Sequence, residues 1–253
     1  MILTLIGLLT GLVLGLTGAG GALIAIPLFL TGLHVSLNEA TFLSLIVVMI
    51  ASGINYLGGH IGGGQKADNK IVSGLFASSF LGTAMALQIK PYVGDLVTAS
   101  LLGLISLYGL WSVWKKKSSA KRGVEVKTFW PVIFSGIIFG ALTTLTGLGG
   151  GVLIIPLLIN FFHLSYEEAL PSSLLLIFLI SLSSFVMQLL KKGSGGVRGI
   201  DIFFLFIGTV LASLVVKKIM GKIPAKWSEL GRRVVFTLVV LYSFMAIGQK
   251  VLV

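Results

Sequence analysis

Two glycine-rich stretches, residues 17–22 and 146–151, interrupt apolar runs that are otherwise continuous. Glycine weakens a helix by about 1 kcal/mol per residue, so each stretch is expected to end one helix and begin another. The N–H groups that open the second helix then point into the gap, where the positive end of the helix dipole favours an anion. The residues predicted to bind this anion are Thr17, Gly18, Gly20, Gly21, Thr146, Gly147, Gly149, Gly150 and Gly151.

Polar side chains inside the apolar segments are the second set of candidates. Asn55 lies one turn after Ser52, and Ser181 and Ser184 occupy the corresponding positions in the second half of the chain. Polar groups at membrane depth usually face the interior of a helix bundle. Asn55, Ser181 and Ser184 are therefore expected to contact the substrate, and hydrogen bonding between helices is an equally good interpretation.

The sequence offers little support for proton coupling, catalysis, or binding of a metal or cofactor. His34 and His163 precede Ser-x-x-Glu sequences that end at Glu39 and Glu168, a pattern that favours helix capping over proton coupling. The chain has no cysteine and only three histidines, and it shows no Ser-His-Asp pattern or nucleotide-binding loop. We therefore expect no catalytic residues, no metal and no cofactor, and the protein is not expected to be an enzyme.

The composition is that of an integral membrane protein. Of the 253 residues, 56% are hydrophobic and 11% charged, and the mean hydropathy is +1.06. Soluble domains carry about 25% charged residues. The net charge of +11 is concentrated in short loops between apolar runs, which indicates membrane orientation and contact with lipid headgroups, not nucleic-acid binding.

The apolar runs predict an all-α polytopic protein with two homologous halves. Residues 2–33 and 129–162 are too long for one upright span, and the glycine stretches divide each into two pieces too short to cross a core of ~30 Å. The first membrane repeat is assigned to residues 1–114, a basic linker to 115–128 and the second repeat to 129–253. Full-length spans are expected at about 37–57, 71–89, 96–114, 168–190, 200–219 and 234–253.

The internal repeat is visible without gaps. A shift of 129 positions aligns residues 7–45 with 136–174 and gives sixteen identities, more than apolar composition accounts for. The third span matches at a shift of 126, where Gly82-Thr83 meets Gly208-Thr209. Duplicated, interrupted segments are typical of secondary transporters and point to their substrate site.

Loop charges favour one of two topologies. If each broken segment crosses the membrane once, the halves are parallel; if each is re-entrant, the halves are inverted. The re-entrant arrangement places the loops at 58–70, 115–128 and 217–233 on one face and gives the larger bias of basic residues. The positive-inside rule therefore favours inverted repeats with re-entrant broken segments.

The repeated signature resembles that of the TauE/SafE family of sulfite exporters and related permeases. The first copy runs from Gly11 to Gly21 and is followed by Pro27-Leu28; the second runs from Gly140 to Gly151 and is followed by Pro156-Leu157. The resemblance covers essentially the whole chain. It implies a multi-pass transporter in the plasma membrane of a bacterium or archaeon, with a small, often sulfur-containing anion such as sulfite or an organosulfonate as substrate.

These observations predict a secondary transporter that binds a small anion between the two glycine-broken segments, with a proton as one possible coupling ion. The direction of transport and the oligomeric state stay open. An anion channel is one alternative, since paired half-helices also build pores. A membrane enzyme or a non-transporting assembly subunit is the other, although no loop is long enough to hold a soluble active site.

Overall fold

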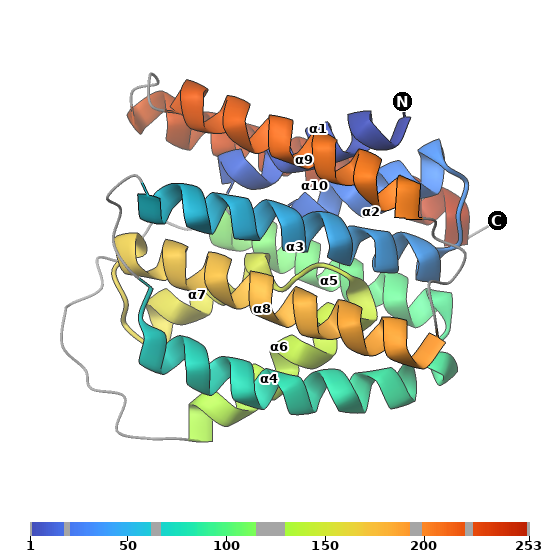
Figure 1. The fold of residues 1–253 in the computed structure, drawn as a ribbon, viewed down its shortest axis with the longest axis horizontal. Helices are drawn as coiled ribbons and strands as arrows, with labels where there is room; N and C mark the ends of the chain where they lie inside the picture. Colours follow the sequence, from blue (N-terminus) through green and yellow to red (C-terminus); the bar gives the residue numbers. More distant parts are fainter. Residues whose placement is uncertain are drawn as a thin grey trace.

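The structure is a computed structural model that describes residues 2–17, 21–61, 67–114, 130–192, 199–220 and 225–251. All regular elements of this described part are helices (Figure 1). Their bounds are α1 Ile2–Thr17, α2 Gly21–Gly32, α3 Leu37–Ile61, α4 Asn69–Ile89, the 3-10 turn η1 Lys90–Tyr92, α5 Asp95–Trp114, α6 Trp130–Thr146, α7 Gly151–Asn160, α8 Tyr166–Lys192, α9 Gly199–Met220 and α10 Ala225–Val251.

Five of the helices are long and apolar enough to cross a bilayer: α3, α4, α5, α8 and α9. The large apolar side chains on the outer faces of α5 and α9 are exposed, among them Leu104, Trp111, Phe203 and Leu214. Small hydroxyl residues are buried inside the bundle instead, as Ser52 and Thr83 are. This distribution suits a protein surrounded by lipid, and the chain is a multi-pass membrane protein.

Both predicted capping boxes are confirmed. At the start of α3, Ser36 Oγ accepts from the N–H of Glu39 at 3.3 Å, and the Glu39 carboxylate accepts from the N–H of Ser36 at 2.9 Å. Ser165 and Glu168 repeat both bonds at the start of α8. Each box satisfies N–H groups that the first helical turn leaves without an internal partner.

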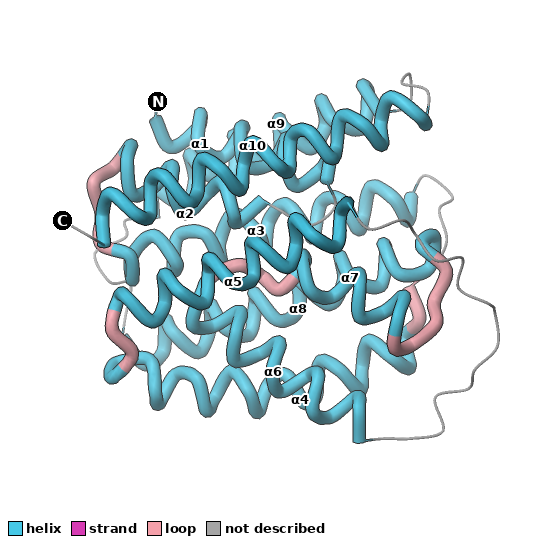
Figure 2. The backbone as a smooth tube through the Cα atoms, turned by 180° about the vertical axis from the view of Figure 1, so that it is seen from behind, coloured by secondary structure: helices cyan, strands magenta, loops and turns pink. Residues whose placement is uncertain are grey.

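The central pair of the bundle is α3 and α8, which run antiparallel. Phe42 lies 5.4 Å from Phe185 between ring centroids, and Gly53 lies against Phe178. On one side of this pair α4 packs along α6, and on the other α1 packs along α9. Figure 2 shows the layers from behind, with α1, α9 and α10 on one side of α3 and α8, and α4 and α6 on the other.

Glycines bring the outer helix pairs close together, as their spacing predicts. A Cβ on Gly7 would lie 2.6 Å from the carbonyl oxygen of Leu205 in α9, and one on Gly140 would overlap the carbonyl of Ser79 in α4. No side chain fits at either position without moving the facing backbone. These glycines therefore serve close packing between helices.

The predicted last span begins too late. The basic stretch 221–233 was expected to be a loop, but α10 already begins at Ala225. The segment Ala-Lys-Trp-Ser-Glu-Leu consists largely of residues with good helix propensity, and charge does not prevent a helix from extending beyond the apolar span. The third segment shows a smaller difference, since α3 continues through Gly58 and Gly59 to Ile61.

Candidate functional site

The loop between α6 and α7 lies inside the bundle. Residues 147–150 connect the two helices and are all buried. Gly147, Gly149 and Gly150 have φ angles of 70°, 66° and 70°, a left-handed conformation that side-chain-bearing residues rarely adopt. Figure 2 shows this loop in the middle of the bundle, whereas the other described loops lie at its two ends. Non-helical backbone at membrane depth is tolerated where protein surrounds it or where it lines a cavity.

The loop reaches the middle of the membrane-spanning helices. A Cβ on Gly149 would lie 3.2 Å from Ile177 and would overlap Val48. Ile177 is near the centre of α8 and Val48 near the centre of α3. Gly147 is held nearer the start of α3, where Ser44 Oγ donates to its carbonyl oxygen at 2.8 Å. Gly149 therefore lies close to the mid-depth of the bundle.

The start of α7 presents N–H groups at this depth. Leu153 and Ile154 donate to the carbonyl of Gly150 at 2.9 Å, and Thr146 Oγ1 accepts from Leu148 at 3.4 Å. The N–H groups of Gly149 and Gly150 make no hydrogen bond to any described residue. They lie at the positive end of the α7 dipole, an environment that favours an anion.

Two buried hydroxyls lie beside these N–H groups. Thr143 Oγ1 is 3.2 Å from the Cβ position of Gly150, and Ser181 Oγ is 3.3 Å from that of Gly149. Both side chains are fully buried, and neither hydroxyl has a hydrogen-bond partner among the described residues. A buried hydroxyl without a partner costs about 1–3 kcal/mol, which a ligand with oxygen acceptors would recover.

A second group of hydroxyls follows one turn further along α8. Ser184 Oγ lies 2.9 Å from Thr144 Oγ1 and 3.4 Å from Thr83 Oγ1, which joins α8 to α6 and α4. Thr144 also donates to the carbonyl of Gly140 at 2.8 Å. Ser184 thus makes hydrogen bonds between helices, the second of the two interpretations given above. The Ser181 hydroxyl makes no such bond and can donate to a ligand.

Beyond Ser184 lies a buried lysine, Lys90, which directly follows the predicted span 71–89. Lys90 is 6% exposed. Its Nζ donates to Gln188 Oε1 at 2.9 Å, to the Thr144 carbonyl at 3.2 Å and to Thr41 Oγ1 at 3.5 Å. A single basic residue in the last turn of an apolar span was the only signal in the sequence. Its acceptors come from three other helices, which no local pattern reveals.

The first broken segment is described only in part. α1 ends at Thr17 and α2 begins at Gly21; Gly18 and Gly20 lie outside the described residues, as does the side chain of Thr17. A Cβ on Gly21 would lie 2.6 Å from Leu14. Asn55 is on α3 beyond Val48, with its Nδ2 buried and without a partner in the described part of the chain.

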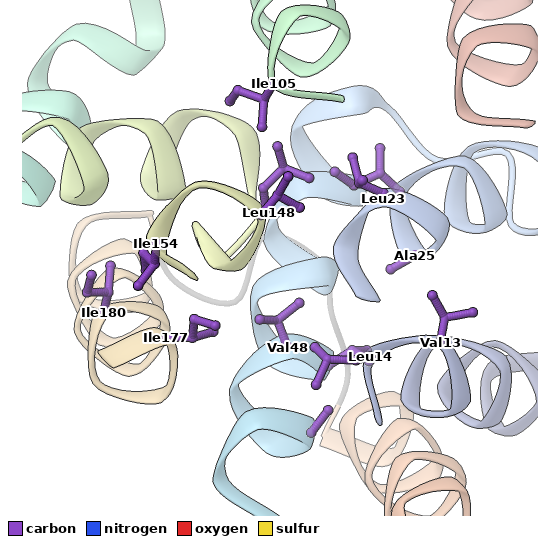
Figure 3. Close-up of a cluster of buried hydrophobic side chains, with 14 of the residues drawn as sticks. Val13, Leu14, Leu23, Ala25, Val48, Ile105, Leu148, Ile154, Ile177 and Ile180 are labelled. Carbon is purple, nitrogen blue, oxygen red and sulfur yellow. The ribbon is translucent and has the colours of Figure 1, made fainter. Parts of the chain in front are cut away.

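The described parts of both broken segments share one apolar cluster. Leu14 of α1 and Leu23 of α2 are buried in the same core as Leu148 and Val48. Figure 3 shows Leu23 close to Leu148, and Leu14 close to Val48. Of the predicted site residues, the structure thus brings Ser181 of α8 beside Gly149 in the loop that runs from Thr146 to Gly151, and Ser184 bonds Thr144 one turn further along α8.

Thr143 was missed by the sequence analysis. It precedes the glycine stretch by one turn, and its repeat-equivalent is Leu14, so a search for matched polar positions passes over it. Among the described residues, no group of three or more His, Asp or Glu side chains could hold a metal ion.

Comparison with known proteins identifies the family. A family model, sulfite exporter TauE/SafE, matches residues 3–246, which is nearly the whole chain. No curated protein and no solved structure gives a significant match. The match includes both glycine stretches and all five of the described helices that are long and apolar enough to cross a membrane. The chain therefore belongs to the TauE/SafE family of sulfite exporters, whose members are membrane transporters.

Proposed function

We propose that this protein is a secondary transporter of a small sulfur oxyanion, such as sulfite or an organosulfonate, and that the anion binds at the loop of residues 147–150. One observation carries the proposal: at mid-depth, the N–H groups of Gly149 and Gly150 have no partner among the described residues, and neither do the Thr143 and Ser181 hydroxyls that lie beside these two glycines. The family match supports the class of substrate.

The chemistry of the site suits an oxyanion. Backbone N–H groups can only donate, and a hydroxyl can donate as well. Sulfite and sulfonates carry three oxygens on one sulfur, so a single anion can accept from several donors at once. The proposal includes no chemical change of the substrate, and the energy source is an ion gradient or the gradient of the substrate itself.

The course of the helices supports a re-entrant second segment. α6 runs parallel to α4, since Val132 faces Gly74 and Thr144 accepts from Lys90. α8 also runs parallel to α4, since Thr83 lies near Ser184 and Lys90 donates to Gln188. α7 ends at Asn160 and α8 begins at Tyr166. α7 therefore returns to the end of the bundle where α6 begins.

Matching contacts in the two halves support the inverted repeat. α6 of the second half packs along α4 of the first, and α1 of the first half packs along α9 of the second. The pairs α2 with α10 and α7 with α5 correspond in the same way. In this arrangement the two re-entrant segments enter from opposite faces, and the anion lies between them. Rocking of one half against the other would then expose the site to each face in turn.

Transport of sulfite by purified protein in liposomes tests the function. The liposomes are loaded with unlabelled sulfite, and labelled sulfite is added outside. A secondary transporter is expected to accumulate the label inside, because it exchanges one bound sulfite for another. A channel would equilibrate the label without such counterflow, and an assembly subunit would give no flux.

Residence in the plasma membrane of a bacterium or archaeon is part of the proposal.

A further inference from the structure

A row of buried polar side chains leads from the 147–150 loop towards one end of the bundle. Ser181, Ser184 and Gln188 lie on one face of α8, spaced by about one turn each. Their side chains are 0%, 0% and 5% exposed. The row starts at the loop and ends where the Lys90 ammonium group bonds Gln188 Oε1.

The placement of Lys90 is unusual for a lysine at a helix end. Such a lysine normally extends its ammonium group to the aqueous face. Tyr92, two residues further on, is 89% exposed, so this turn lies at the surface of the protein. The Lys90 side chain nevertheless turns into the bundle towards α3, α6 and α8. Burying a cation costs free energy, which indicates a function inside.

Gln188 adds a second donor. The ammonium group can only donate, so its partner on Gln188 must be the amide oxygen, and the amide nitrogen faces the other way. That Nε2 is buried and has no partner among the described residues. The cluster thus combines a positive charge with an available N–H donor, which together suit an oxyanion.

Ser181 and Ser184 have polar repeat partners, Ser52 and Asn55, but the Lys90 end of the row aligns with non-polar residues. The repeat shifts of 126 and 129 align Lys90 with Val216, Gln188 with Gly59 and Thr144 with Gly15. Where Lys90 donates to Thr144, the other half packs Val216 against Gly15, whose Cβ position is 2.9 Å from the valine. None of the three aligned positions, Val216, Gly59 and Gly15, carries a cation.

We propose that Lys90 and Gln188 form a second oxyanion site, which recruits the substrate on the route between the 147–150 loop and the end of the bundle where α4 ends. The inference rests on the proposed function. The anion meets the charge of Lys90 first and then passes along Ser184 to the donors at Gly149 and Gly150. The opposite route, lined at the equivalent positions by Val216 and Gly59, lacks this step.

Sulfite uptake by liposomes tests the second site with the variants K90M and Q188E. K90M removes the charge. Q188E keeps an oxygen for the ammonium group but adds a carboxylate that neutralises it and repels an anion. Each variant is expected to raise the sulfite KM at least about tenfold, the size expected for losing a bond to a charged group, while the maximal rate changes by less than about twofold.

Lys191 provides the matched control. Its Nζ donates to the Leu87 carbonyl at 2.7 Å at the same end of the bundle, but the residue is exposed. K191M is expected to leave KM unchanged. If K90M does not fold, Q188E still tests the second site, because the new carboxylate pairs with the Lys90 ammonium group and preserves the packing there.

An unchanged KM in Q188E, or an equal rise in K191M, would overturn the second site while the proposed function stands. Absence of sulfite binding and flux in the unaltered protein would overturn the proposed function, and the second site with it.

Discussion

At the scale of single residues, the most informative feature is a pair of hydroxyls that have no partner in the described structure. Thr143 and Ser181 are as deeply buried as the apolar core, yet their oxygens make no hydrogen bond there. Buried hydroxyls in folded proteins are normally bonded, and Ser52 and Ser184 are. The exceptions lie beside the loop whose N–H groups are also available, which is why we assign them to the substrate.

Replacing these hydroxyls should separate binding from stability. T143V and S181A are each expected to raise the dissociation constant for sulfite about tenfold or more, since a hydrogen bond to a charged group contributes about 1.5–3 kcal/mol. The melting temperature should stay the same or rise, because no bond is lost on removal of an unpartnered hydroxyl. Calorimetric titration and thermal unfolding of the detergent-solubilised protein measure both quantities.

Ser172 offers a control on the same helix. Its Oγ donates to the Glu168 carbonyl at 2.7 Å and accepts from the N–H of Asp68 at 2.9 Å. S172A is expected to lower the melting temperature and leave sulfite affinity unchanged, the opposite pattern. A fall in stability without loss of affinity in T143V and S181A would show that these hydroxyls serve packing.

The sequence predicted part of this site and missed part of it for physical reasons. Gly149, Gly150 and Ser181 could be found because the glycine stretch and its repeat are local patterns. Thr143 and Lys90 could not, because their significance depends on which side chains the fold brings beside them. Lys90 in particular resembles an ordinary interfacial lysine until its bonds to Thr144 and Gln188 are known.

At the scale of helices, close packing between the two halves depends on glycine. Gly140 meets the backbone of Ser79, and Gly136 meets Ser78 and the Leu75 carbonyl. A neighbouring backbone cannot rotate away as a side chain can, so even one added methyl group has to separate the helices. This contact holds α6, and with it the 147–150 loop, against α4.

Alanine at Gly140 is therefore expected to reduce the free energy of unfolding by about 1–3 kcal/mol. Gly248, in α10, has open space around its Cβ position, and G248A should be neutral or slightly stabilising, since alanine favours a helix. Thermal unfolding of both variants in the same detergent gives the comparison. Equal effects at the two positions would mean that close approach of α6 and α4 is not required.

Helix boundaries show where local sequence suffices. The capping boxes at the starts of α3 and α8 were predicted correctly, because a capping box acts within four residues. The start of α10 was wrong, because a charged segment was taken for a loop and charge alone does not break a helix. Periodicity and capping decide such boundaries better than polarity does.

At the scale of the whole molecule, the central question is how the two halves are oriented. Figure 1 shows the turn that joins α2 to α3 at the opposite end of the bundle from the turn that joins α7 to α8. In a parallel arrangement these two corresponding turns would lie on the same side. Their separation follows from the antiparallel course of α3 and α8.

The natural absence of cysteine makes this orientation easy to test. Single cysteines at Asn38 and Phe161, both exposed, lie near the two turns, and Tyr92 marks the same end as Asn38. In intact cells an impermeant maleimide reaches only the outer face, so it should label either N38C and Y92C or F161C, but not both sets. Labelling of N38C and F161C from the same side would contradict the inverted arrangement.

The position of the bound anion is the most direct test of the account. Selenite has the shape and charge of sulfite, and its selenium can be located by anomalous scattering in crystals of the protein. The account predicts selenium at the 147–150 loop, with its oxygens about 3 Å from the N–H groups of Gly149 and Gly150 and from the hydroxyls of Thr143 and Ser181. Selenium bound elsewhere, with this loop empty, would contradict it.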